Sequence, residues 1–131
     1  MRIYGRRIYK GSAEGEVIIT KEPITFLGGV DPNSGIVTER GHELFGKSIS
    51  GKILVFPYGK GSTVGSYVIY QLKKNGKAPL GIINLKAEQI VATGAIISRI
   101  PMLDSLEKDP FEILKGGMKI KMNATEGYID V

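Results

Sequence analysis

The sequence predicts a mixed fold of the α+β or α/β class, with two sheet layers and one helical layer in a β/β/α arrangement. The first third of the chain is rich in short strand-like segments, whereas the later part alternates between strand and helix patterns. The chain has 131 residues, 42% of them hydrophobic, and contains neither an internal repeat nor a long linker. We therefore expect one compact domain, residues 1–131, with a single core.

The first half of the chain is predicted to consist of strands and turns. Residues 6–20 have the pattern of two short strands around a Gly-Ser turn, because β-branched residues follow one another near the end of this segment. Residues 26–37 are rich in the Gly, Pro, Asn and Asp residues of turns. Residues 46–57 predict a turn and then a strand. Its apolar run, Ile53–Phe56, does not alternate, which indicates burial on both faces.

Two helices and a strand are predicted in the middle of the chain. After Ser62, apolar side chains recur at nearly helical spacing, and Gly76 is a natural stop for this helix. Ser62 itself is a suitable N-cap. A buried strand is predicted at residues 78–85, followed by a short helix at residues 86–98.

The last third of the chain predicts an extended segment, a helix and two closing strands. Residues 99–103 contain a proline and are expected to be extended. Asp109 followed by Pro110 is a standard helix start, and a Gly-Gly pair ends that helix. Residues 118–123 and 127–131 alternate like strands on either side of a turn.

The residue composition excludes several kinds of site. The chain has no cysteine, which excludes disulfides, thiol catalysis and any iron–sulfur or thiolate–zinc site built from this chain alone. Its single histidine, His42, argues against a histidine-rich metal site. No stretch approaches the roughly 18 apolar residues of a membrane span, and the first residues lack the apolar stretch of a signal peptide. We therefore expect a cytoplasmic protein that does not bind a membrane.

The net charge of +5 raises the question of nucleic-acid binding. Four cations, Arg2, Arg6, Arg7 and Lys10, lie close together near the start of the chain. The other cations are spread among acidic residues, and no aromatic-rich binding motif accompanies them. We expect these cations to belong to a solvated or partner-facing strand and not to a nucleic-acid site. A small basic structural or RNA-binding protein is the alternative.

The segment FPYGKGSTVGSYVIY places Ser62 in a glycine-rich turn directly before a helix, and three known motifs with this character fail. A phosphate-binding P-loop needs Ser or Thr after its lysine, whereas Lys60 is followed by glycine. A nucleophile elbow needs glycine two residues before and after the serine, where this chain has Lys60 and Val64. The dinucleotide-binding fingerprint, G-x-G-x-x-G, fails as well, because the third glycine of this chain comes one residue too late to fit it.

What remains is the physical chemistry of the turn. Gly59 and Gly61 allow a sharp turn and leave room for another group to approach. The first helix amides, near Thr63 and Val64, lack intrahelical acceptors and lie at the positive end of the helix dipole, so they favour an anion or a serine oxyanion. Ser62 fits either of two roles: a helix cap or a reactive group. Because no base lies nearby in the sequence, an activating group would come from another chain.

Three segments of the sequence resemble one family. They are FLGGVDPNSGIV, GHELFGKSISGKILVFPYGKGST and APLGIINLKAEQIVATGAIISRIPML, which occur in this order within residues 26–103. Together they resemble the small subunit of the aconitase X family, which corresponds to the swivelling domain (domain 4) of aconitases. The resemblance implies a β/β/α fold that presents a Gly-Ser turn to a large subunit. It also implies that Ser62 is the catalytic proton acceptor, and we expect the flanking Gly61 and Thr63 to bind substrate.

The resemblance also implies a reaction, a cofactor and a partner. Archaeal members of this family dehydrate mevalonate 5-phosphate to trans-anhydromevalonate 5-phosphate, in a modified mevalonate route to isoprenoids. The enzyme is a hydro-lyase whose four-iron–four-sulfur cluster is held by the large subunit of a heterodimer. We expect this chain to bind no cluster, to be inactive alone and to act on a small phosphorylated hydroxy acid. Ordinary aconitases continue with Ser-Arg after their Gly-Ser, whereas this chain has Thr63-Val64, which argues against a tricarboxylate substrate.

Two alternatives and two residues stay open at this point. Other aconitase X members resemble hydroxyproline dehydratases, and no residue here selects between the two substrates. The tail resembles that of phosphohistidine-carrying swivel domains, but those need a histidine just after a Gly-Gly turn, and His42 lies far downstream of the pair at residues 28–29. Asp31 is expected to fix a turn at Pro32. His42 fits a structural role or one in orienting a substrate or a partner side chain.

Overall fold

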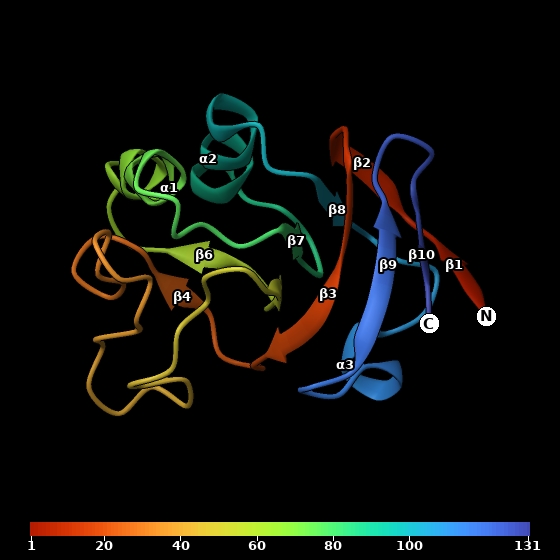
Figure 1. The fold of residues 1–131 in the computed structure, drawn as a ribbon, viewed down its shortest axis with the longest axis horizontal. Coiled ribbons are helices and arrows are strands. Elements are labelled where there is room, and N and C mark those ends of the chain that lie inside the picture. The colour runs from red at the N-terminus through yellow and green to blue at the C-terminus, as the bar shows by residue number, and fades with distance from the viewer.

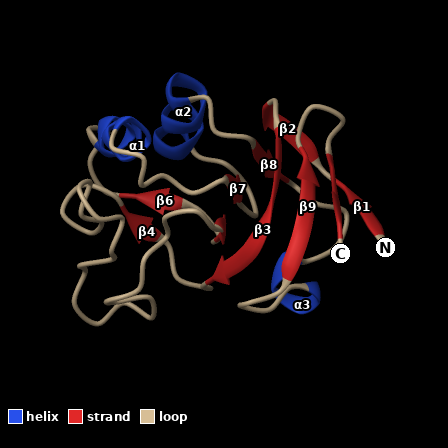
Figure 2. Ribbon diagram, viewed as in Figure 1, coloured by secondary structure: helices blue, strands red, loops and turns tan.

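A computed structural model describes residues 1–131. Figure 2 shows a large curved sheet with two helices on one side and a third, short helix at one end of the sheet. The strands are β1 (Arg2–Tyr4), β2 (Arg6–Tyr9), β3 (Ser12–Ile19), β4 (Ile24–Thr25), β5 (Ile53–Val55), β6 (Gly59–Lys60), β7 (Gly81–Ile83), β8 (Met102–Asp104), β9 (Lys119–Asn123) and β10 (Tyr128–Asp130), and the helices are α1 (Gly65–Lys74), α2 (Gln89–Ser98) and α3 (Pro110–Ile113).

The main sheet has eight strands in the order β1-β10-β9-β3-β5-β7-β8-β2. The long strand β3 joins its two halves, since β3 pairs antiparallel with β9 and parallel with β5. The half made of β1, β10 and β9 is antiparallel, whereas β5, β7 and β8 run parallel to one another. These two halves and the helices form the three layers of the predicted β/β/α fold, and the predicted fold class is confirmed.

The two outermost strands of this sheet are consecutive in the chain. Only Gly5 separates β1, which pairs with β10, from β2, which pairs with β8. The Gly5 amide donates to the carbonyl of Gly127, so the chain stays bonded to the sheet through the bend. Because β1 and β2 are continuous through this bend, the sheet is closed on itself like a small barrel.

The closed sheet has one apolar cluster inside and another outside, where sequence analysis predicted a single core. Along β5, Ile53 and Val55 belong to the inner cluster, whereas Leu54 belongs to the outer one beneath the helices. All three side chains are fully buried, which confirms the predicted strand that is covered on both faces. The length and composition of the chain do not indicate that the two faces of one sheet cover two separate apolar clusters.

Helices α1 and α2 lie side by side over the outer cluster (Figure 1). No helix in the structure is both long enough and apolar enough to cross a membrane. Asp109 caps α3 as predicted, since its carboxylate accepts the Phe111 amide at 2.9 Å. This helix ends at Ile113, before the predicted Gly-Gly stop, because Leu114 is extended and its side chain is buried in the inner cluster.

An ion pair between the exposed Arg6 and the buried Asp104 ties the closed sheet to the start of α2. The fully buried Asp104 accepts two hydrogen bonds from the Arg6 guanidinium, at 2.8 and 2.7 Å, and a third from the Ala87 amide at 2.7 Å. Burial raises the pKa of the Asp104 carboxyl, but the hydrogen bonds from Arg6 and Ala87 outweigh burial and hold this pKa below its usual value.

We expect Asp104→Asn to lower the free energy of unfolding by about 2–3 kcal/mol at neutral pH, because charge-assisted hydrogen bonds to a buried group are lost. A carboxyl with a depressed pKa contributes stability above its unfolded pKa of about 4, and this contribution is lost as the pH falls through the folded value. Urea unfolding at pH 7 and in acid measures both effects. Equal acid sensitivity of the variant and the natural protein would contradict this assignment.

Candidate active site

The glycine-serine turn lies on a small sheet that the sequence did not predict. After β5 the chain forms β6, which pairs in parallel with β4, and then turns through Ser62 into α1. Figure 1 shows β4 and β6 near α1, on the opposite side of the molecule from β1, β9 and β10. Strands of two residues carry no sequence periodicity, so this support for Ser62 was missed.

Ser62 does not occupy the N-cap of α1, and that prediction was wrong in register. The helix begins at Gly65, and its N-cap position is Val64, which has no side-chain oxygen. Ser62 instead closes the turn before the helix: its Oγ accepts the Val64 amide at 3.2 Å, and its carbonyl accepts the Gly65 amide at 2.9 Å. The hydroxyl is thus fixed by one backbone donor and lies on the surface.

The two glycines before Ser62 are required by close neighbours. Gly61 has φ +90°, and a Cβ there would lie 2.8 Å from Cγ2 of Thr25. A Cβ on Gly59 would lie 2.5 Å from Cγ2 of Val91 and 2.8 Å from an oxygen of Glu88. The turn is therefore packed against β4 on one side and the start of α2 on the other.

The polar groups of this turn are available to another molecule. The amides of Gly61, Ser62 and Thr63 donate to no backbone or side-chain acceptor within the chain. The proton of the Ser62 hydroxyl has no acceptor here either, and Lys60 forms no ion pair. The turn thus combines an exposed hydroxyl, three unpaired N–H donors and a nearby cation, and no basic group of this chain activates the serine.

A hollow of about 260 Å³, lined by both polar and apolar side chains, adjoins this turn between the first turns of α1 and α2. Thr63 and Val64 line it on one side, and Gln89, Ile90 and Thr93 line it on the other. The residue next to Ser62 therefore opens directly onto a concave surface. This position fits a site that is completed by a second molecule.

His42 and Asp31 both have structural roles. The buried His42 accepts the Leu44 amide at Nδ1, at 3.0 Å, and its Nε2 lies 3.1 Å from the Pro23 carbonyl, to which it donates in that tautomer. Both ring nitrogens are therefore engaged, and neither is available to carry a phosphoryl group. Asp31 accepts hydrogen bonds from the Asn33 amide and the Ser34 hydroxyl, which confirms its predicted role in the turn at Pro32.

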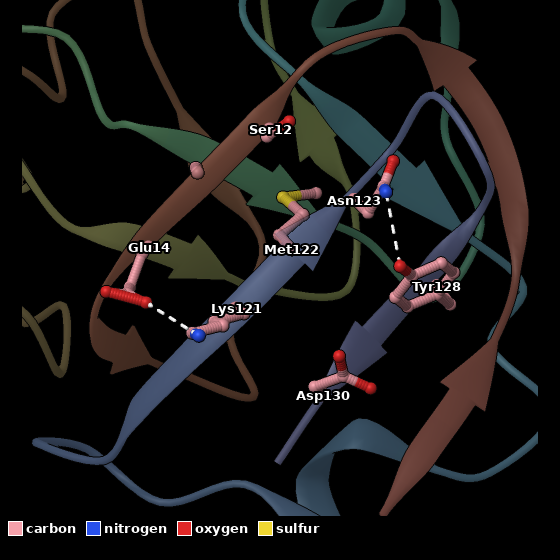
Figure 3. Close-up of a pocket in the computed structure, with 8 residues that line it drawn as sticks. Ser12, Glu14, Lys121, Met122, Asn123, Tyr128 and Asp130 are labelled. Carbon is pink, nitrogen blue, oxygen red and sulfur yellow. Dashed lines mark hydrogen bonds and ion pairs between the residues drawn. The ribbon is translucent and has the colours of Figure 1, made fainter.

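A charged hollow of about 400 Å³ lies outside this region, on the outer face of β3, β9 and β10. Figure 3 shows Lys121 pointing toward Glu14, and Asn123 bonded to the Tyr128 hydroxyl. Asp130 accepts hydrogen bonds from the Arg2 guanidinium, a side chain that Figure 3 does not draw. These groups pair with one another across neighbouring strands, so this hollow is a solvated sheet face. No residue of the Ser62 turn lines it.

Most of the early cations are also bound within the chain. Arg2 pairs with Asp130, Arg6 pairs with Asp104, and Arg7 donates to the Thr125 carbonyl. The basic cluster of the sequence is therefore largely part of the strand pairing that closes the sheet.

The residues of this chain do not fit an iron–sulfur cluster. Cysteine is absent, and no three His, Asp or Glu side chains gather where they could hold a metal ion. A cluster at this site would need ligands from another polypeptide.

Comparison with protein families and solved structures shows which family this chain belongs to. The family model described as Aconitase X swivel domain matches residues 2–131. The chain belongs to the aconitase X swivel domain family. Within this family it is similar to a relative from Methanosarcina acetivorans, at 62% identity over 100% of this chain and 91% of the relative. A relative from Thermococcus onnurineus is 56% identical over 100% of this chain and 98% of the relative. Both are named phosphomevalonate dehydratase small subunit.

The fold of this swivel domain also matches that of a solved family member. The crystal structure of Thermococcus kodakaraensis aconitase X in its holo-form superposes with a TM-score of 0.94 at 58% identity, and the match covers 99% of this chain and 97% of that chain. A solution NMR structure of a UPF0107 protein matches with a TM-score of 0.89 at 50% identity. The family resemblance drawn from the sequence is therefore confirmed.

Proposed function

We propose that this chain is the small subunit of a hydro-lyase that dehydrates mevalonate 5-phosphate to trans-anhydromevalonate 5-phosphate. The observation that carries the proposal is the exposed Ser62 turn, found in a chain whose full-length relatives, at 50–63% identity, are named phosphomevalonate dehydratase small subunit. The reaction would supply a modified mevalonate route to isoprenoids. The location of such an enzyme would be the cytoplasm.

In this proposal Ser62 is the proton acceptor. Dehydration removes a proton from carbon and a hydroxyl group from the neighbouring carbon. Ser62, as its alkoxide, would take the proton from carbon. The leaving hydroxide would take up the proton that Ser62 had earlier given to a group of the large subunit, so that water is released. The Val64 amide, 3.2 Å from Oγ, stabilises the alkoxide form of the serine, because it is a backbone donor at the positive end of α1.

The neighbouring backbone would bind the substrate. The unpaired amides of Gly61 and Thr63 flank Ser62, and they can donate to an anionic oxygen of a phosphorylated hydroxy acid. Gly61 serves this purpose because no side chain covers its N–H group. These two residues are therefore proposed as substrate-binding through their main chain.

A large aconitase X-type subunit would complete the site. The name small subunit, carried by the relatives, implies such a partner, and this chain has no group to activate Ser62. We assign the four-iron–four-sulfur cluster to that subunit, because this chain has no ligands for it.

The test is a substrate comparison on the reconstituted pair. The chain is co-expressed with the large subunit, and the purified pair is offered mevalonate 5-phosphate and, separately, hydroxyproline. Proton NMR follows the formation of an alkene in each reaction. We expect turnover of mevalonate 5-phosphate only. Turnover of hydroxyproline alone would assign the chain to the other branch of the family.

A further inference from the structure

Thr25 lies directly against the turn that carries Ser62. Its Cγ2 methyl is 2.8 Å from the point where a Cβ on Gly61 would lie, and the three heavy atoms nearest to that point all belong to Thr25. The amides of Gly61, Ser62 and Thr63 bind nothing in the chain, so backbone hydrogen bonds do not fix this side of the turn. The methyl group of Thr25 is therefore the side-chain contact that supports Gly61 from β4.

The position of Thr25 is itself well determined. In the parallel pairing of β4 and β6, Thr25 is opposite Lys60 and Ile24 is opposite Gly59. Residues paired in this way point to the same face of a sheet. Ile24 is buried in the outer cluster, so Thr25 and Lys60 face away from that cluster, toward the Ser62 turn. Register and burial together hold the Thr25 side chain beneath Gly61.

The two ends of the Thr25 side chain have different surroundings. The methyl contacts Gly61 most closely, whereas Oγ1 lies 3.6 Å from the same point and hydrogen-bonds nothing in the chain. A positioning role therefore belongs to the methyl, and a ligand role would belong to the hydroxyl. These two roles can be separated by substitution, because valine keeps the methyl and serine keeps the hydroxyl.

We propose that Thr25 is a positioning residue for Ser62. Its methyl group holds Gly61 in the left-handed conformation that points the Ser62 hydroxyl out of the turn. The inference rests on the proposed function, because it assumes that Ser62 takes the proton. A displacement of about 1 Å at a reacting group can reduce turnover by as much as 10²-fold.

The experiment compares Thr25→Val with Thr25→Ser in the complex with the large subunit. We expect Thr25→Ser to lower kcat about tenfold with KM unchanged, because the methyl support is lost. Thr25→Val should keep kcat within about twofold of the natural enzyme, since valine fills the same contact. The reverse pattern would make the hydroxyl a substrate ligand and overturn the proposal. Equal behaviour of the two variants, active or inactive, would overturn it as well.

A second comparison, in the Ser62→Ala background, separates positioning from general damage. If Thr25 acts through Ser62, adding Thr25→Ser to Ser62→Ala should not lower the residual turnover further. A further tenfold loss would show that Thr25 acts elsewhere and would overturn the proposal. If Ser62→Ala alone turns over normally, the proposed role of Ser62 fails, whatever the Thr25 variants do.

Discussion

Ser62→Ala should reduce turnover of the assembled enzyme by roughly 10²- to 10⁴-fold, the usual scale for removal of an acid–base group. Alanine removes the oxygen that would take the proton, whereas the backbone turn and the Thr25 contact remain. The loss of one exposed hydrogen bond to the Val64 amide should lower the free energy of unfolding by no more than about 1 kcal/mol. Steady-state kinetics and urea unfolding measure the two effects separately.

Ser62→Gly is the matched control for the structural role. Glycine readily adopts turn conformations, and its only direct loss at this position is the hydrogen bond from the Val64 amide to Oγ, which contributes about 1 kcal/mol. Turnover should fall as far as in the alanine variant, and co-elution with the large subunit on a sizing column should be unchanged. If the glycine variant works normally in the complex, Ser62 only closes the turn and the catalytic assignment is wrong.

The isolated chain should show no dehydratase activity, and mixing it with the large subunit should restore full activity. The reason is chemical: the chain presents the exposed hydroxyl of Ser62, but it has no base at this turn to activate that hydroxyl and no ligands for a metal ion. A serine hydroxyl without such help is a weak base at neutral pH. A titration of one purified subunit against a fixed amount of the other, followed by substrate loss, measures this dependence.

The titration should reach its plateau near equal amounts of the two chains, as a heterodimer requires. The Ser62→Ala chain is the control, because it should bind the large subunit and compete with the natural chain without restoring activity. Substantial turnover by either subunit alone would place the whole reaction in one polypeptide and would refute the shared site.

Patterns that repeat along the sequence predicted most of the fold. The apolar run around Leu54 marked a strand buried on both faces, and the Asp109-Pro110 pair marked a helix start; both follow from local physical preferences. The pairing of β1 with β10 depends on residues at opposite ends of the chain. Because such pairing leaves no local signal, sequence analysis could not predict that the sheet closes.

At the candidate site, too, local sequence patterns were predictive, whereas contacts between distant residues were not. Ser62 was identified from its glycine neighbours and the helix pattern that follows, but its register relative to the helix was misjudged by two residues, because turn and helix residues share similar backbone angles. Thr25 was missed entirely. It lies in a strand of two residues, 37 positions before Ser62, and only the pairing of β4 with β6 brings the two together.

The bend at Gly5 also bears on when this protein can fold in the cell. Strand β1 pairs with β10, which is made much later, and the Met1 amino group donates to the Val131 carbonyl at 2.9 Å. Until β10 has been made, β1 lacks this partner, and the inner apolar cluster lacks Ile129. Pairing of residues so distant in sequence is intrinsically slow. The closed sheet can therefore form only after β10 has emerged from the ribosome, and until then the early strands remain exposed to unwanted association with other nascent chains.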